Sequence, residues 1–246
     1  ARAIRLMDSL KRRQDRERPE AIVLALPNGV IPLGQRDIDH IVAHYDGGIR
    51  YADFNIQRFF DALKEMGLYD DAIIIVFSEH GENLGDGLKR RSTERRLIGH
   101  GMLYEENIRM PLLVKYPGFP PRRVSSQVQL IDLYPTILDM LGVSPPAAAK
   151  KQIQGKSFLP EITGRGGGFS EYAYGEGSRP SQLRSVRSLG WKLMRHADKN
   201  LLLFNLASDP GETRSVLGRY PDVAGILGKR LSEWELRNLE KRSEAP

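Results

Sequence analysis

Two short, unbroken apolar runs and a third that is interrupted by Lys115 constrain the fold of this chain most. They occupy residues 21–26 (AIVLAL), 72–77 (AIIIVF) and 111–117 (PLLVKYP). Runs of this length without polar alternation are typical of strands that are buried on both faces of a sheet. Between the first two runs, residues 36–66 carry apolar side chains at three- and four-residue spacing, which predicts one long helix with its apolar stripe against the sheet. Strands that alternate with helices predict an α/β fold, with a mostly parallel sheet sandwiched by helices.

The second half of the chain changes character after one more helix. Residues 128–143 predict a helix that is entered through Asp132 and Pro135 and ended by Gly142. Residues 144–180 are rich in Pro, Gly, Ala and Ser, which indicates a boundary. Beyond it, short alternating stretches predict antiparallel strands, and residues 220–241 return to helical spacing. We therefore expect residues 1–165 to belong to the α/β domain, and 166–246 to form a small antiparallel β subdomain with a closing helix.

Composition limits the chemistry that the chain can carry. It has 246 residues and no Cys, which excludes disulfides, zinc thiolate clusters and a directly encoded thiol nucleophile. Lys and Arg number 37 against 31 Asp and Glu, a net charge of +6 that favours anionic partners without demanding nucleic acid. No stretch reaches the roughly 18 apolar residues of a membrane span. The sequence therefore predicts no nucleic-acid partner and no membrane span, and it leaves the cellular compartment open.

The apolar run at 72–77 ends abruptly in Ser78, Glu79, His80, Gly81 and Glu82. Side chains at the carboxyl end of a strand can converge on a ligand in an α/β enzyme. A carboxylate beside an imidazole suits calcium, magnesium or manganese when further carboxylates join it. A capped, solvated turn is the alternative interpretation of the same residues.

The wider sequence resembles the C-terminal half of the sulfatase family, within the alkaline phosphatase superfamily. The resemblance rests on GLYDDAIIIVFSEHGENLGD (67–86), GHGMLYEENIRMPLLVKYPG (99–118), QLIDLYPTILDMLGV (129–143) and RSVRSLGWKLMRHADKNLLLFNLASDPGETRSV (184–216). These motifs follow one another in the order of the family, from about residue 41 to residue 234. The resemblance implies an alkaline phosphatase-like fold for 1–165 and the closing hairpin of the family for the tail.

The same resemblance implies roles for three residues. Glu79 and His80 stand where the family has an Asp followed by His or Asn, which complete a calcium or magnesium site built mainly from upstream acids; manganese is a further candidate. Glu in place of Asp moves the carboxylate outward by one methylene. His100, in GHG, stands where the family often has a Lys or His that contacts the sulfate oxygens. An exposed loop histidine is the alternative for His100.

The chain also departs from the family pattern. The family nucleophile is a formylglycine made from the Cys, or sometimes the Ser, of a C-x-P-S-R motif that lies upstream, and this chain has no Cys. Residues 178–182 (SRPSQ) mimic the Ser form, but they lie downstream and end in Gln, so we interpret them as a surface loop. The resemblance therefore implies a partner region, the upstream N-terminal half of the enzyme, which supplies the formylglycine and the remaining acids. This chain alone is expected to be inactive.

The function implied is that of a sulfuric ester hydrolase acting on an anionic sulfate ester, either a small molecule or a glycan. One alternative keeps the superfamily and changes the substrate to a phosphodiester or a phosphonate monoester. The other is a non-catalytic remnant that binds sulfated polyanions through its basic cluster, Lys89, Arg90, Arg91, Arg95 and Arg96. That cluster suits the steering of anions or a merely solvated loop. Export or a periplasmic location would require a signal upstream of Ala1.

Overall fold

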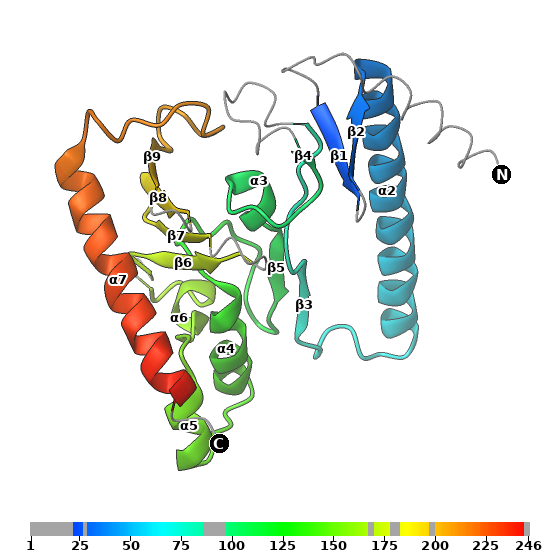
Figure 1. Ribbon diagram of the computed structural model, residues 1–246. Helices are drawn as coiled ribbons and strands as arrows, with labels where there is room; N and C mark the ends of the chain where they lie inside the picture. The colour runs from blue at the N-terminus through cyan, green and yellow to red at the C-terminus, as the bar shows by residue number, and fades with distance from the viewer. Residues whose placement is uncertain are drawn as a thin grey trace.

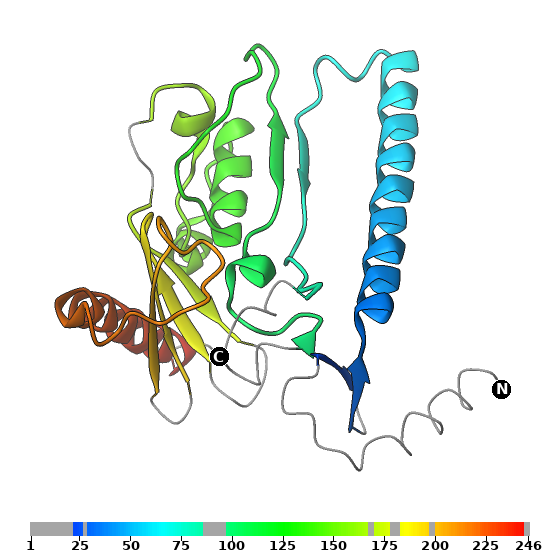
Figure 2. The same ribbon diagram turned by 90° about the horizontal axis from the view of Figure 1, so that it is seen from above.

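The computed structural model describes residues 22–26, 29–85, 97–166, 170–177, 183–196 and 200–243. Helix α2 (Gln35–Glu65) stands at one side of the molecule and helix α7 (Pro221–Ser243) at the other (Figures 1 and 2). Between them lie three small sheets, with strand orders β2-β1-β4, β3-β5 and β6-β7-β8-β9. The basic cluster at 89–96 and the SRPSQ stretch lie outside the described residues.

The first two sheets are mainly antiparallel. Strand β1 (Ile22–Leu26) pairs antiparallel with β2 (Gly29–Leu33), and it pairs parallel with β4 (Leu97–Ile98) over two residues. Strand β3 (Ile74–Phe77) pairs antiparallel with β5 (Leu112–Lys115). The mostly parallel sheet expected from the sequence is therefore not seen in the described part of the chain. An apolar run predicts a buried strand but not the direction of its partner, and a parallel pair needs a crossover connection.

Helix α2 forms as its periodicity predicts, and Gly47 and Gly48 do not interrupt it. The Asp37 carboxylate accepts a hydrogen bond from the backbone N–H of Gly34 at 2.9 Å, which satisfies an otherwise unpaired group at the helix start. The first turns pack through a small cluster of Ile38 and Ile98 with Leu33, Ile41 and Val42. Near the other end of the helix, the ring of Phe60 contacts that of Tyr69, with centroids 5.8 Å apart. Farther along the same stripe, Tyr45, Ile49 and Phe59 are exposed. The prediction that the whole stripe packs against a sheet thus holds only for the start of the helix in this structure.

The predicted helix at 128–143 is a 3₁₀ turn (Leu130–Asp132) followed by α4 (Leu133–Met140). Asp132 is buried, and its carboxylate accepts the backbone N–H groups of Gln129 at 2.8 Å and Lys156 at 2.9 Å. Burial raises the pKa of Asp132 although both hydrogen bonds favour the charged form. The contact with Lys156 connects the start of α4 to the Pro- and Gly-rich stretch. That stretch contains two short helices that composition did not predict, α5 (Ala147–Gln152) and α6 (Leu159–Ile162).

The C-terminal sheet is antiparallel, as the sequence predicts. It contains β6 (Ala173–Glu176), β7 (Arg184–Arg187), β8 (Trp191–Arg195) and β9 (Leu201–Asn205). Leu193 and Leu203 face α7, whereas the next residues along each strand, Met194 and Phe204, face Leu103 and Tyr104. This sheet therefore forms the floor beneath the loop that carries His100. The division into domains at 165/166 stays a prediction.

Candidate metal and anion site

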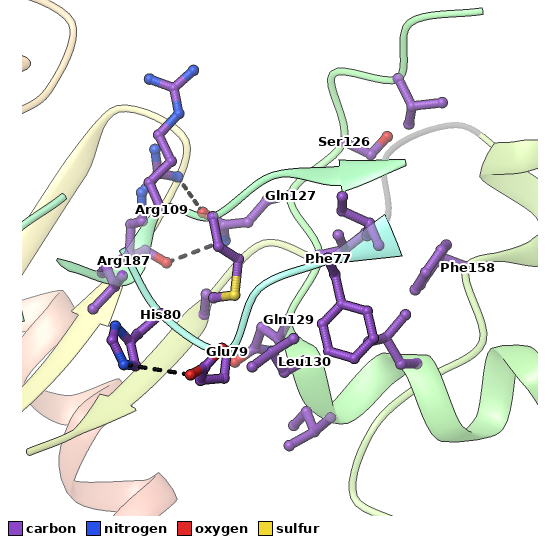
Figure 3. Close-up of a pocket in the computed structure, with 18 of the residues that line it drawn as sticks. Phe77, Glu79, His80, Arg109, Ser126, Gln127, Gln129, Leu130, Phe158 and Arg187 are labelled. Carbon is purple, nitrogen blue, oxygen red and sulfur yellow. Dashed lines mark hydrogen bonds and ion pairs between the residues drawn. The ribbon is translucent and has the colours of Figure 1, made fainter. Parts of the chain in front are cut away.

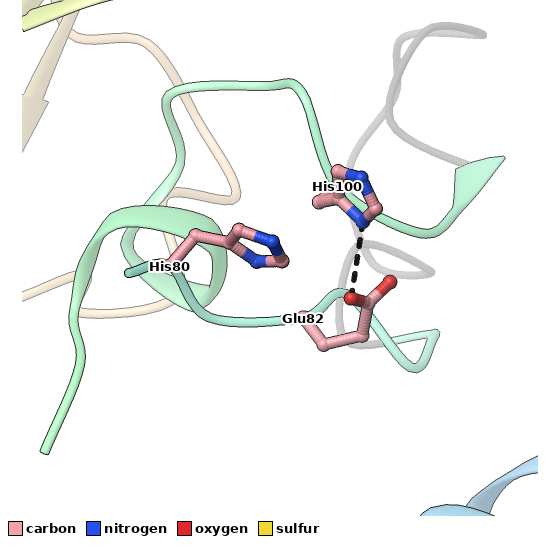
Figure 4. Close-up of side chains that lie close together, drawn as sticks. All are labelled: His80, Glu82 and His100. Carbon is pink, nitrogen blue, oxygen red and sulfur yellow. Dashed lines mark hydrogen bonds and ion pairs between the residues drawn. The ribbon is translucent and has the colours of Figure 1, made fainter. Parts of the chain in front are cut away.

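The site lies where two chain segments meet directly after strands. Glu79 and His80 follow β3, and His100 follows β4 (Figure 4). Asn83 and Gly99 exchange two backbone hydrogen bonds of 3.0 Å, which places the two segments side by side. The buried side chain of Asn107 donates a further hydrogen bond to the Gly99 carbonyl at 3.0 Å. The backbone around the site is thus fixed by main-chain hydrogen bonds and by the buried side chain of Asn107.

Gly81 is required by the closeness of the two segments. Its N–H donates to the carbonyl of Asn107 at 2.8 Å. A Cβ at this position would lie 2.2 Å from the backbone oxygen of Glu106, closer than any real Cβ contact. Only glycine therefore lets the chain, after it leaves β3, pass this close to the short helix α3 (Glu105–Ile108). This close approach sets the direction of the neighbouring His80.

The structure brings His80 and His100 together. Their rings stack with centroids 4.4 Å apart and an angle of 29° between the planes. Nδ1 of His80 lies 2.7 Å from the carbonyl oxygen of Gly81. Because a carbonyl only accepts, this nitrogen carries the hydrogen, and in the neutral ring Nε2 is the nitrogen with the free lone pair. Nε2 lies 3.6 Å from the carboxylate of Glu79, whose side chain is 79% exposed.

Glu82 joins this pair, and sequence reasoning did not assign it a role. Its Oε2 lies 3.3 Å from Nδ1 of His100, and one ligand atom from each of His80, Glu82 and His100 lies within 4.8 Å of the others (Figure 4). The signal was present in the sequence, because alternate residues of an extended segment point the same way and Glu82 follows His80 by two. The roles assigned to Glu79, His80 and His100 stay predictions.

A buried ion network supports the loop that carries His100. The carboxylate of Glu105 lies 3.0 Å from Nε of Arg187 and 3.2 Å from Nζ of Lys192. Lys192 also pairs with Glu212 at 2.8 Å, and both of these side chains are completely buried. Glu212 in turn accepts the backbone N–H of Glu105 at 2.7 Å. Three elements that are distant in the sequence are thereby joined beneath the site.

Burial and charge act differently on the two acids of this network. Burial alone would raise the pKa of Glu105, but Lys192 and Arg187 outweigh it and the net shift is downward. Burial raises the pKa of Glu212 by more than Lys192 lowers it. Glu212 sits in the DPGE turn at φ 52, a left-handed conformation that is uncommon for residues other than glycine.

An open pocket of about 1560 Å³ lies against the site (Figure 3). Glu79, His80 and His100 contribute to its wall. Its other lining residues include four arginines, Arg109, Arg122, Arg123 and Arg187, and apolar side chains such as Phe77, Leu130 and Phe158. The guanidinium of Arg187 donates hydrogen bonds to Gln127, as drawn in Figure 3, and to Glu105. Acids line the pocket as well, among them Glu105, Glu161 and Glu176, so the wall is of mixed charge; its arginines and apolar side chains suit an anionic ligand with an organic group.

Comparison with known proteins decides the family. The family model "Sulfatase" matches residues 8–143, more than half of the chain, and "N-sulphoglucosamine sulphohydrolase, C-terminal" matches residues 93–238. The chain belongs to the sulfatase family. The resemblance noted in the sequence is thereby confirmed.

Individual relatives and solved structures are similar to the chain over most of its length. Arylsulfatase K of Bos taurus is 28% identical over 214 residues, which are 80% of this chain and 37% of the relative. A structure in complex with its substrate D-glucosamine-2-N,6-O-disulfate superposes with a TM-score of 0.67 at 24% identity, covering 78% of this chain and 40% of the other. The phosphonate monoester hydrolase of Agrobacterium radiobacter gives 0.69 at 25% identity, with 82% and 42% covered.

This sulfatase chain thus spans about two fifths of the length of the relatives that it matches. The solved sulfatase structures that superpose on this chain have the alkaline phosphatase-like fold. In the part of the chain that the structure describes, no helix is both long enough and apolar enough to span a membrane.

Proposed function

We propose that the chain is the C-terminal part of a sulfuric ester hydrolase and carries part of its metal and sulfate site. The observation that supports this most directly is the family match, together with the convergence of Glu79, His80 and His100 on one open pocket. The substrate is an anionic sulfate ester, on a small molecule or a glycan. The arginines of the pocket wall would attract it.

Glu79 and His80 would hold a divalent cation, Ca²⁺ or else Mg²⁺ or Mn²⁺. The residues fit this role in part: the Glu79 carboxylate is exposed and Nε2 of His80 is free to ligate. Calcium takes six to eight oxygen ligands, so the remaining acids would come from an upstream region. When bound, such a cation polarises the ester and offsets the charge that develops in the transition state. His100, which is 61% exposed, would donate a hydrogen bond to a sulfate oxygen.

The upstream region would also complete the fold. Apolar side chains are left exposed on three elements of the first half of the chain, namely Ile49 and Phe59 on α2, Phe77 on β3 and Leu113 on β5. We infer that upstream strands pack here, supply the parallel part of the sheet and bring the formylglycine nucleophile to the pocket. The lengths of the relatives support such a region.

The test has two stages. Sequencing the DNA upstream of Ala1 should show a reading frame that continues through a C-x-P-S-R or S-x-P-S-R motif. In the complete gene product, Glu79→Ala and His100→Ala should each lower the turnover of an aryl sulfate at least about a hundredfold, as loss of a transition-state contact does. Glu233→Ala, on the exposed side of α7, is the matched control and should leave turnover unchanged. Unchanged activity in both site variants would exclude the assignment.

A phosphonate monoester is the second candidate substrate. It is favoured by the likeness to the phosphonate monoester hydrolase of Agrobacterium radiobacter, at 25% identity. The same cation and the same hydrogen-bond donor would accommodate a phosphoryl oxygen. Assaying an aryl sulfate, an aryl phosphonate and a phosphodiester side by side separates the two, because the native substrate class should give the highest kcat/KM.

A further alternative is a remnant that binds sulfated polyanions without turnover, which the net charge of +6 would favour. Salt-sensitive binding to a heparin-like polymer, with no hydrolysis by the complete gene product, would support that alternative.

A further inference from the structure

We propose that His80, Glu82 and His100 form a binding site for a divalent transition metal of the Zn²⁺ class. Nitrogen and oxygen atoms from the three side chains lie within 4.8 Å of one another. This set differs from the pair Glu79 and His80, because it contains two imidazoles and a single carboxylate. Two imidazoles and a carboxylate are a ligand set that zinc takes in proteins, with a fourth position left open, whereas calcium selects oxygen ligands.

The structure prepares His80 for this role. Its Nδ1–H points to the Gly81 carbonyl at 2.7 Å. Metal-ligating histidines usually donate their second ring nitrogen in this way, which fixes the tautomer and leaves the other nitrogen for the metal. The backbone beneath is held by the paired bonds between Asn83 and Gly99 and by the close passage of Gly81. One ligand of the three is therefore already oriented.

The remaining adjustment falls on the most exposed member of the cluster. Ligand atoms around a tetrahedral Zn²⁺ ion lie about 3.3 Å apart, given metal–nitrogen distances of about 2.0 Å. Oε2 of Glu82 and Nδ1 of His100 already lie 3.3 Å apart. His100 is 61% exposed, so its ring can rotate out of the stack with His80 and direct a lone pair to a shared ion. Glu82, with only 22% of its side chain exposed, stays in place.

Occupation of this site would have a consequence for hydrolysis, an argument that rests on the proposed function. Because Nδ1 of His80 is engaged with Gly81, its Nε2 can ligate only one cation at a time, so a bound Zn²⁺ would withdraw His80 from the cation of the proposed site and His100 from the sulfate oxygens. Zn²⁺ should therefore inhibit the complete enzyme, and Glu82→Gln should relieve the inhibition. The binding itself does not depend on hydrolysis, since all three ligands lie in this chain.

The experiment is a titration of the chain with ZnCl₂ by isothermal calorimetry. His40 and His44 on α2 are a second histidine pair, with ring centroids 4.5 Å apart, and they are one helical turn apart. The chain is therefore studied with His40→Gln and His44→Gln already in place. We expect one Zn²⁺ per chain, at least about tenfold weaker binding after Glu82→Gln or His100→Gln, and a tetrahedral absorption spectrum with Co²⁺.

Glu233→Gln is the matched control. It removes a carboxylate on α7, outside the cluster, so Zn²⁺ affinity should be retained. Far-UV circular dichroism and thermal melts of each variant show whether the fold survives, and Co²⁺ spectra report the ligand geometry independently. The proposal is overturned if the histidine-reduced chain binds no Zn²⁺, or if Glu82→Gln and His100→Gln bind it as tightly as their parent. Neither result bears on ester hydrolysis, which is measured separately through Glu79→Ala.

Discussion

Replacement of Lys192 by Met tests the buried ion network most directly. Lys192 is completely buried and is the cation that faces Glu212, which is equally buried, at 2.8 Å. Glu105 has a second cation in Arg187, so it is less affected by the loss. Removing one partner of a buried pair leaves an uncompensated charge and costs about 3–5 kcal/mol. We therefore expect Lys192→Met to lower the free energy of unfolding by about this amount.

A double-mutant cycle separates the ion pair from simple packing. Glu212→Gln alone leaves Lys192 with Glu105 at 3.2 Å, so it should cost only about 1–3 kcal/mol, the penalty for a disturbed buried hydrogen bond. The double variant Lys192→Met/Glu212→Gln should be more stable than Lys192→Met, because no bare carboxylate stays buried there. The free energies come from urea unfolding followed by far-UV circular dichroism, provided that the m-values agree.

An exposed pair on α7 serves as the reference. Arg230 and Glu233 lie 3.4 Å apart with 47% and 36% of their side chains exposed, and solvent screens such a contact. Arg230→Met should leave the unfolding curve unchanged within error. If Lys192→Met cost less than about 1 kcal/mol, or cost the same with and without Glu212→Gln, the view of this network as a coupled buried charge pair would be wrong.

Three further predictions concern other parts of the chain. Gly81→Ala should destabilise the chain by about 1–3 kcal/mol in urea, because the new Cβ would lie 2.2 Å from a backbone oxygen. Gly48 lies in mid-helix with open space around it, so Gly48→Ala should stabilise the chain by up to about 1 kcal/mol. Folding lowers the pKa of Glu105, so the charged carboxylate contributes its full stability above about pH 4.5. This contribution is lost as the pH falls through the pKa of Glu105 in the folded state. Thermal melts of Glu105→Gln should therefore show a shallower loss of stability on acidification than those of the parent. Ile49→Gln and Phe59→Gln should leave the melting temperature of this chain unchanged, because both side chains are exposed, and should lower that of the complete gene product if an upstream region packs on them. Equal effects in the two proteins would contradict that packing.

Helices and hairpins were predictable because their signals are local. The periodicity of residues 36–66 specifies α2 whatever the helix packs against, and Gly67, at φ 70, ends it in the left-handed conformation that glycine tolerates. Asp132 and Gly142 similarly mark the limits of the region around α4. The alternation in 184–206 gives two faces to the C-terminal sheet, and both faces are buried as the pattern requires.

The direction of strands was not predictable from the same signals. β3 and β5 read as strands buried on both faces, which is typical of a parallel sheet, yet they pair antiparallel and leave Phe77 and Leu113 exposed. An apolar run indicates that a strand or helix face is suited to apolar neighbours. Strands β3 and β5 and the later part of the α2 stripe lack such neighbours in the described part of the chain. This mismatch is itself the physical argument for packing against a further region.

The site was predictable in part. Glu79, His80 and His100 were proposed from motifs and stay predictions, whereas Glu82 entered only when the backbone bonds between Asn83 and Gly99 placed two loops side by side. The two-residue spacing of His80 and Glu82 places both on one side of an extended segment, but it does not show that His100 lies on that side.

The ion network shows why motifs so far apart in the sequence belong to one site. Glu105 in YEE contacts Lys192 in WKL, 87 residues later, and Glu212 in DPGE, 107 residues later. Each motif alone reads as a solvated charge near a turn. Together they fix the base of α3, whose Asn107 holds Gly81 on one side and Gly99 on the other. The C-terminal sheet therefore acts on the histidines through α3, and a change in the tail, such as Lys192→Met, should weaken Zn²⁺ binding at His80 and His100 as well as stability.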